Sequence, residues 1–185
     1  MLDAAEELFR EGGGDALTVE AVIDRAGTST GSFYARFGSR RGLFVAMHER
    51  FLETFGAAVQ AVALDALDQS TLHESLHTFV LGVLTAVRRH RDTLLFHVIQ
   101  NAHDDDMRVQ GNELTQGAFA LILEIVKAHS SETSPIDLDK IDLFGRALHG
   151  LTLQMMLFGD HEVTGRAMSD ERCAEVFTEM VMANL

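Results

Sequence analysis

Apolar residues recur at helical spacing along almost the whole chain, and this periodicity constrains the fold more than any other feature. Val19, Val22, Ile23 and Ala26, for example, stand at positions i, i+3, i+4 and i+7 of one helix face. No stretch shows the sustained alternation of a half-buried strand, and Pro135 is the only proline. We therefore predict an all-α fold of about nine helices.

Glycines and capping residues divide the first forty residues into three short helices. A helix over about residues 2–11 ends at Gly12 to Gly14, because glycine readily takes the backbone conformations that stop a helix. Thr18 caps a second helix of two turns, which ends in a tight turn at Gly27. Ser29 caps the third. Two short helices about a glycine turn are typical of a helix-turn-helix.

The rest of the chain is expected to form longer helices. Ser39 caps a fourth helix that reaches about residue 66 and joins the short helices to the remainder. Further helices are expected at about residues 71–90, 91–102, 105–130, 137–158 and 169–184. Their boundaries are Asp92, the acidic cluster at 103–106, Ser134-Pro135 and a loop at 159–168.

The net charge of −13 argues mildly against a nucleic-acid partner, because phosphate binding depends on Lys and Arg. The acid is concentrated C-terminally: residues 1–50 hold six Arg and eight Asp or Glu, and the remainder holds nine basic and twenty acidic residues. Residues 33–50 contain four arginines and only one acidic residue, Glu49. This short segment is locally basic, although exposed arginines are also typical of an ordinary solvated helix face.

The third helix offers small and polar side chains to a DNA groove once Phe33 and Phe37, four residues apart, are assigned to the core. Hydroxyls and unpaired N–H groups at a helix N-terminus can donate to phosphates or base edges. The predicted DNA-binding residues are Thr18, Thr28, Thr30, Gly31, Ser32, Tyr34, Arg36 and Arg40. In the alternative interpretation Thr18, Ser29 and Ser39 are ordinary caps, and Tyr34 and Arg36 lie on a solvated surface.

The segment from Leu17 to Phe51, LTVEAVIDRAGTSTGSFYARFGSRRGLFVAMHERF, strongly resembles the DNA-binding segment of the TetR family of repressors. Thr18 matches the family's threonine before the second helix, Ala26-Gly27 its turn, and Tyr34 and Phe37 its tyrosine and following aromatic residue. Arg40 stands where the family has a lysine, so a planar fork replaces a point charge. The stretch AAEELFREGG also resembles the family's first helix, which a basic arm usually precedes.

The resemblance implies a helix-turn-helix DNA-binding domain over residues 1–47 and an effector-binding and dimerisation domain over 48–185. It implies a repressor that binds a near-palindromic operator in double-stranded DNA as a homodimer and leaves it when a small-molecule effector binds. It implies neither a cofactor nor a metal nor catalytic residues. No apolar run approaches the roughly 20 residues of a membrane span and no signal sequence is evident, so we expect no membrane partner and a cytoplasmic location.

Two apolar stripes near the C-terminus are candidates for the dimer interface. The first follows 3-4 spacing from Ile141 to Phe158, and the resemblance implies that both pair with their twofold mates in a four-helix bundle, with Gly145 and Gly150 permitting close approach. The predicted interface residues are Ile141, Phe144, Leu148, Leu151, Met155, Phe177, Met180 and Val181. The alternative is that both stripes pack within the subunit.

An effector pocket is expected among the helices between about residues 55 and 158. The predicted lining residues are Phe79, Phe96, His97, Gln100, Phe119, Leu123, His149 and Gln154. The alternative is that the apolar members of this set are plain core.

A competing enzyme hypothesis rests on residues 73–77, which spell the zinc motif HExxH. His73 and His77 would share one helix face as zinc ligands, with Glu74 as general base. A catalytic zinc site needs a third protein ligand, and no histidine follows at the metzincin spacing. The alternatives are a segment that binds metal without catalysis, adventitiously or for regulation, and an exposed helix surface, which we favour. Cys173, the one cysteine, has no catalytic motif around it and is expected to be a small apolar residue.

Overall fold

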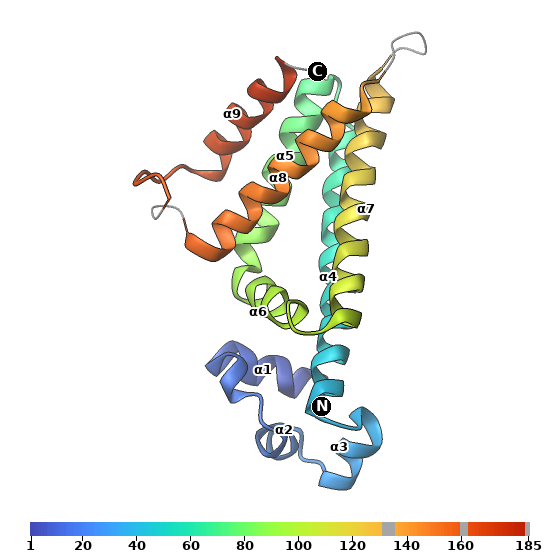
Figure 1. Cartoon of the computed structure of the whole chain (residues 1–185), viewed down its shortest axis with the longest axis vertical. Coiled ribbons are helices and arrows are strands. Elements are labelled where there is room, and N and C mark those ends of the chain that lie inside the picture. Colours follow the sequence, from blue (N-terminus) through green and yellow to red (C-terminus); the bar gives the residue numbers. More distant parts are fainter. Residues whose placement is uncertain (131–135, 160–162, 184–185) are drawn as a thin grey trace. The chain divides into compact units, whose positions relative to one another are not determined.

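The computed structural model describes residues 1–130, 136–159 and 163–183. Over these residues the chain forms nine α-helices, one 3-10 turn and no strand (Figure 1), so the all-α prediction is confirmed. The elements are α1 (Leu2–Gly12), η1 (Gly14–Ala16), α2 (Val19–Ala26), α3 (Thr30–Phe37), α4 (Arg40–Leu67), α5 (Leu72–Arg89), α6 (Arg91–Asn101), α7 (Asp105–His129), α8 (Leu138–Phe158) and α9 (Asp170–Met182).

Apart from the end of α3, for which no position was predicted, and the end of α9, each helix end lies within two residues of its predicted position. The turn η1 was not predicted, because a glycine run indicates the end of a helix but not the conformation of the residues after it. The predicted boundary at Ser134-Pro135, the middle of the predicted loop at 159–168 and the predicted helix end at residue 184 lie outside the described residues.

The chain divides into two compact units, an N-terminal unit (Met1–Thr54) and a C-terminal unit (Phe55–Leu185). The division falls within α4, which contributes residues to both. The core of the N-terminal unit consists of Ala5, Leu17, Val22, Phe33 and Leu43, which are fully buried. Burial of each large side chain contributes roughly 1.5–3 kcal/mol.

The C-terminal unit is organised around α5, which packs against α6, α7, α8 and α9. Its core includes Leu76, Phe79, Val80 and Leu84 of α5 and Ile125 of α7, each exposed by 1% or less. At the crossing of α4 and α5, a Cβ on Gly82 would stand 2.4 Å from Val62, so the glycine permits these two helices to approach closely. Figure 1 shows α8 running across the unit, with α6 at one end of it.

Candidate nucleic-acid interface

The turn between α2 and α3 has the geometry that the glycine predicted. Gly27 adopts φ 59° and ψ 40°, the left-handed conformation that favours glycine. The Gly27 N–H donates to the Asp24 carbonyl oxygen at 3.2 Å, and the Thr28 N–H donates to the Ile23 carbonyl oxygen at 3.1 Å. The turn therefore satisfies the carbonyl groups of Ile23 and Asp24 in the last turn of α2, and three residues separate α2 from α3.

Side-chain caps begin α2, α3 and α4 where the sequence predicted them. The Thr18 hydroxyl accepts a hydrogen bond from the Ala21 N–H at 3.1 Å, and the Ser29 hydroxyl accepts from the Ser32 N–H at 3.1 Å. The Ser39 hydroxyl accepts from the Gly42 N–H at 3.0 Å. These three residues are helix caps, as the alternative interpretation held, and a cap does not exclude a further contact to DNA.

One side of α3 is anchored in the core and the other is exposed. Phe33 is fully buried, and its ring lies 5.5 Å from that of Tyr34 and 5.2 Å from that of Phe37. Phe37 is half-buried, so its core position is only partly as predicted. Tyr34 is 49% exposed although its ring packs edge-on against Phe33. One side of the Tyr34 ring is thus packed against the core residue Phe33 while about half of the side chain is open to solvent.

All but one of the predicted DNA-binding residues are exposed, and Thr28 is half-buried. Gly31 is informative because the fold does not require a glycine there: an added Cβ would meet only the Ser29 hydroxyl, at 3.8 Å. A glycine costs a helix roughly 0.5–1 kcal/mol relative to alanine. Packing within the chain therefore does not explain why residue 31 lacks a side chain.

Arg40 makes contacts that its sequence position did not indicate. Its Nε donates to the Leu17 carbonyl oxygen at 2.8 Å and its Nη2 to the Gly14 carbonyl oxygen at 3.4 Å. Its guanidinium also lies 4.9 Å from the centre of the Phe44 ring, a cation–π distance. One edge of the guanidinium is thus bound to the segment between α1 and α2.

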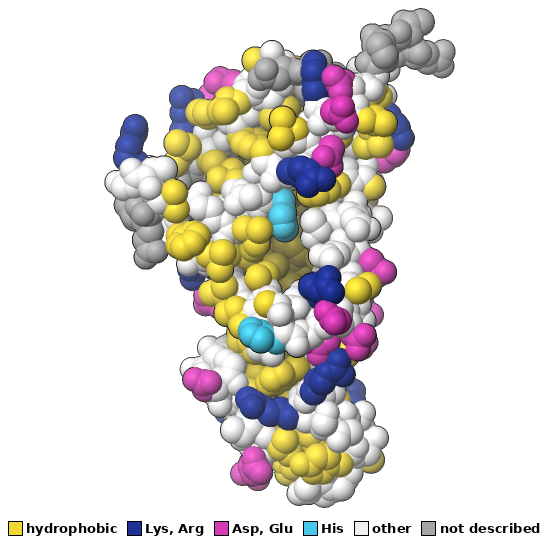
Figure 2. Space-filling view, in the orientation of Figure 1, with side chains coloured by type: hydrophobic (Ala, Val, Ile, Leu, Met, Phe, Trp, Pro, Cys, Tyr) yellow, Lys and Arg dark blue, Asp and Glu magenta, His cyan; other side chains and the backbone are white. Residues whose placement is uncertain are grey.

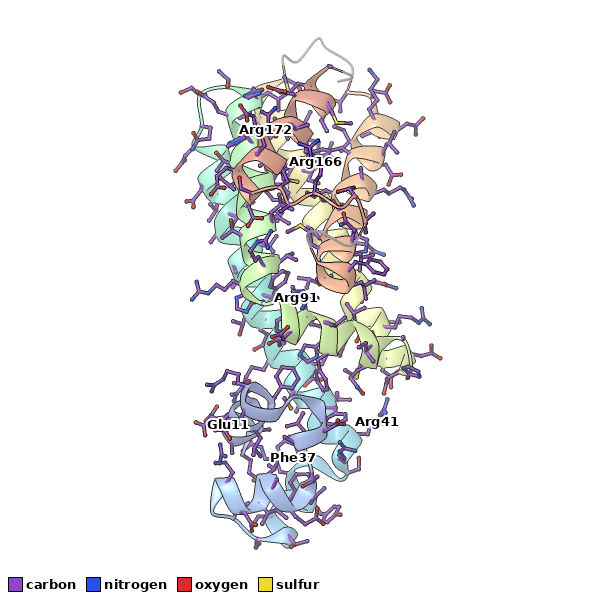
Figure 3. The ribbon with its side chains drawn as sticks, turned by 90° about the vertical axis from the view of Figure 1, so that its left-hand side faces the viewer. Glu11, Phe37, Arg41, Arg91, Arg166 and Arg172 are labelled. Carbon is purple, nitrogen blue, oxygen red and sulfur yellow. The ribbon has the colours of Figure 1, made fainter. Side chains whose placement is uncertain are left out.

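Acidic residues of α1 pair with two of the arginines in the N-terminal unit. Arg25 of α2 donates to both carboxylate oxygens of Glu11, at 3.0 and 2.7 Å, and Arg50 of α4 donates to Asp3 and Glu6. The hydrogen bond from Arg25 lowers the pKa of Glu11, and that from Arg50 lowers the pKa of Asp3. Figure 3 marks Glu11 on α1, away from Arg41 at the start of α4.

These pairs redistribute the charge of the unit. Since Arg25 and Arg50 are bound to the acids of α1, the arginines next to the exposed face of α3 are Arg36, Arg40 and Arg41. Arg50 belongs to the locally basic segment of the sequence, but its partner acids, Asp3 and Glu6, stand more than forty positions earlier in the chain.

Gly42 is a residue of the α3–α4 junction whose role sequence reasoning missed. A Cβ there would stand 1.8 Å from the carbonyl oxygen of Phe37 and 2.9 Å from its carbonyl carbon, both backbone atoms. Only glycine permits this approach of the two helices. The sequence does show a glycine three positions after the capping Ser39. Sequence spacing alone does not show that the Phe37 carbonyl group approaches this glycine.

The predicted effector-pocket residues lie in the C-terminal unit and are partly core. Phe79 and His97 are buried, at 1% and 3% exposure. The other six, Phe96, Gln100, Phe119, Leu123, His149 and Gln154, are half-buried. His149 packs edge-on against Phe119, with ring centres 6.3 Å apart, and burial lowers the pKa of its imidazole. Figure 2 shows a hollow lined with hydrophobic side chains on one face of this unit.

The predicted dimer residues separate into three groups: buried, half-buried and exposed. Ile141, Phe144 and Leu148 are exposed by only 7%, 3% and 4% within the single chain, so they present almost no surface to a second subunit. Phe144 packs against Phe177, with ring centres 5.5 Å apart. Met180 is 63% exposed. The remaining residues, Leu151, Met155, Phe177 and Val181, are half-buried.

The two glycines of α8 also differ. A Cβ on Gly145 would stand 3.0 Å from the Phe119 ring of the same chain, so its close approach is internal. Gly150 is exposed, with nothing within 4 Å of an added Cβ.

The HExxH segment forms the first turns of α5. Glu74 closes a capping box with Thr71: its carboxylate accepts from the Thr71 N–H at 3.1 Å and from the Thr71 hydroxyl at 2.9 Å. His73 is exposed and His77 half-buried. Within residues 1–130, 136–159 and 163–183, no three His, Cys, Asp or Glu side chains are grouped to hold a metal ion. The glutamate of the motif is therefore engaged as a helix cap.

Comparisons with known proteins agree with this geometry. Residues 1–47 match the model of the family described as bacterial regulatory proteins, tetR family. A TetR family transcriptional regulator, PfmR, from Thermus thermophilus has a similar structure, with a TM-score of 0.67 and 18% identity over 100% of this chain and 97% of that chain. A regulator of the TetR/AcrR family from Thermobifida fusca gives a TM-score of 0.65 and 20% identity over 99% and 94%.

A third similar structure is a TetR-like transcriptional regulator from a Rhodococcus species, with a TM-score of 0.61 and 22% identity over 100% of this chain and 94% of that chain. No curated protein sequence matches the chain. Among the described residues, no helix has the length and apolar character needed to cross a membrane.

The capped α2–turn–α3 arrangement and the family match over residues 1–47 define the N-terminal unit as a helix-turn-helix of the kind found in bacterial regulatory proteins. This match over residues 1–47 agrees with the family resemblance that the segment from Leu17 to Phe51 predicted. The family model matches the N-terminal helices, and the similar structures extend the likeness in fold to the rest of the chain.

Proposed function

We propose that this protein is a transcriptional regulator of the TetR family and acts as a repressor. It would bind a near-palindromic operator as a homodimer and leave it when a small molecule occupies the C-terminal unit. The residues that contact DNA would be those of the exposed face of α3 and of its flanks: Thr18, Thr28, Thr30, Gly31, Ser32, Tyr34 and Arg36. Arg40, at the start of α4, lies beside this face and is bound to the segment between α1 and α2. One observation carries the DNA-binding part: α3 is held by a buried Phe33 while Gly31 beside it is open and serves no packing purpose.

A groove of DNA explains the exposed face of α3 better than a plain surface does. Hydroxyls and backbone N–H groups near the start of α3 can donate to phosphates and base edges, and Gly31 lets the duplex approach the backbone. Tyr34 presents its hydroxyl from a ring held against Phe33. A single short helix reads few base pairs, so two copies related by a twofold axis would read two half-sites.

The exposed face of α8 supports the homodimer. Leu143, Ala147, Gly150, Gln154 and Leu157 follow 3-4 spacing, the same period as the buried stripe, and all but the half-buried Gln154 are exposed. Leu143 is 67% and Leu157 47% exposed. A helix pairing with its mate needs such a stripe of apolar and small residues. We therefore shift the proposed interface from Ile141, Phe144 and Leu148 to this face of α8, with Met180 and Val181 of α9.

The effector part of the proposal is supported by the hydrophobic hollow in Figure 2 and by the half-buried polar residues His149, Gln100 and Gln154. Apolar walls with a few polar groups are typical of small-molecule sites. Since α4 contributes residues to both units, it is the element through which a ligand would change the spacing of two recognition helices. A ligand that binds one spacing more tightly would shift the population toward it.

The test is selection of bound sequences from random double-stranded DNA, followed by affinity measurement on the enriched sequence. We expect an inverted repeat whose half-sites are separated by about one helical turn, roughly 10 base pairs. Tyr34→Phe removes only the hydroxyl and should weaken binding, while Leu64→Ala, on an exposed position of α4 in the C-terminal unit, should not. Equal binding by the wild type to random and enriched DNA would contradict the proposal.

A further inference from the structure

Residues 13–18 form the connector between α1 and α2, and they position the N-terminus of α2. Arg40, at the start of α4, donates hydrogen bonds to this connector. Two of its carbonyl groups, those of Gly14 and Leu17, accept hydrogen bonds from the Arg40 guanidinium at 3.4 and 2.8 Å. Leu17 is fully buried, and a buried carbonyl group without a partner costs free energy comparable to a lost hydrogen bond. The Arg40 bond satisfies the Leu17 carbonyl.

The residue held in this way precedes a proposed DNA contact. Thr18 follows Leu17 directly and caps α2 through the Ala21 N–H at 3.1 Å. The position of the Leu17 carbonyl therefore fixes both the Thr18 side chain and the free N–H groups at the start of α2. In a helix-turn-helix, these groups lie where the first helix crosses the DNA backbone.

An arginine suits this contact and a lysine does not. Nε and Nη2 lie on one edge of the planar guanidinium, so together they reach two carbonyl oxygens at a fixed separation. The Phe44 ring, 4.9 Å from the guanidinium carbon, orients the plane. A lysine ammonium keeps the charge but has no rigid fork, and it cannot stack its polar group flat on the ring.

We propose that Arg40 is a positioning residue: it fixes the connector and the start of α2, and it acts on operator binding through Thr18 rather than by contacting a phosphate. This assignment rests on the proposed operator binding and revises the phosphate role that sequence position gave to Arg40. The edge of its guanidinium formed by Nε and Nη2 is bound to Leu17 and Gly14, and these contacts direct the guanidinium toward the connector.

The test compares Arg40→Lys, Arg40→Gln and Arg36→Gln on the enriched operator, at a temperature where every variant is folded. The affinity and the slope of its logarithm against the logarithm of salt concentration are both measured. If Arg40 positions α2, both Arg40 variants lose affinity about tenfold or more at every salt concentration and keep the wild-type slope. Arg36→Gln, which alters an exposed arginine of α3, supplies the slope change expected of a lost phosphate contact, about two units for a dimer.

The opposite result would assign Arg40 to a phosphate. In that case Arg40→Lys binds like the wild type, and Arg40→Gln reduces the slope by about two units. A second readout uses the free protein: hydrogen exchange at the Leu17 and Ala21 amides should quicken in Arg40→Lys while α5 to α9 exchange as before. If the wild type bound no DNA, the proposed function would fail, but unchanged exchange at these two amides would separately overturn the positioning role.

Discussion

Replacing Gly42 by alanine should destabilise the N-terminal unit more than any other glycine-to-alanine change there. The new methyl carbon would stand 1.8 Å from the Phe37 carbonyl oxygen. Since close carbon–oxygen contacts in proteins lie at about 3.3 Å, α3 and α4 must separate by roughly 1.5 Å. Both groups belong to the backbone, so no change of side-chain rotamer relieves the clash.

The expected cost is about 3 kcal/mol, the upper end of the range for overpacking. For a chain of this size, 1 kcal/mol lowers the thermal midpoint by about 2–4 °C, so we expect a decrease of about 10 °C. Scanning calorimetry of the full chain measures it. The matched control is Gly31→Ala, whose methyl group meets nothing closer than 3.8 Å and whose midpoint should stay or rise slightly. A Gly42→Ala midpoint equal to that of the wild type would refute the packing argument.

Three further predictions concern charge and assembly. Arg36 and Arg41 from two subunits would neutralise about four phosphates. The slope of the logarithm of affinity against the logarithm of salt concentration should therefore be near −4. A slope near −10 would show that other basic side chains of the protein also contact phosphates. The lowered pKa values of Asp3 and Glu11 mean that their ion pairs stabilise the fold above the ordinary carboxyl pKa and that this contribution is lost as pH falls through the lowered values. The thermal midpoint should therefore fall below about pH 4 in the wild type and fall less in an Asp3→Asn, Glu11→Gln double variant; equal pH profiles would contradict the ion-pair assignment. Leu143→Glu should yield monomers in analytical ultracentrifugation while Leu64→Glu, exposed to a similar degree on α4, should not, and a dimeric Leu143→Glu protein would remove α8 from the interface.

The local features of the N-terminal unit were predictable because they depend on neighbouring residues. A cap at Thr18 or Ser29 needs only a hydroxyl and an N–H group three positions later. The turn at Gly27 likewise arises from one residue that tolerates positive φ. Periodicity then predicted the remaining helices, since each must bury one apolar face.

Features that join distant segments were not predictable in the same way. Arg40 binds carbonyl groups 23 and 26 positions earlier, and nothing in the local pattern distinguishes this from a phosphate contact. The stripe through Phe144 shows the related limit: spacing indicates that a helix has an apolar face, but it does not identify whether the same chain or a second copy covers it. The structure buries that stripe internally and leaves the stripe through Leu143 exposed.

The HExxH segment shows how one residue can fit two patterns. Glu74 is both the glutamate of the zinc motif and the third helical residue after the capping Thr71. The capping box needs only these two side chains, whereas a catalytic metal site needs a third ligand brought from elsewhere in the fold. The structure therefore shows the capping box, which is the pattern that depends only on neighbouring residues.

Selection from random double-stranded DNA tests the central claim most directly, because it requires the α2–turn–α3 face to recognise a sequence. We expect enrichment of an inverted repeat that binds two copies of the chain, and we expect Tyr34→Phe to reduce the affinity. No enriched sequence, or an enriched sequence that Tyr34→Phe and Gly31→Leu both bind as tightly as the wild type does, would contradict it.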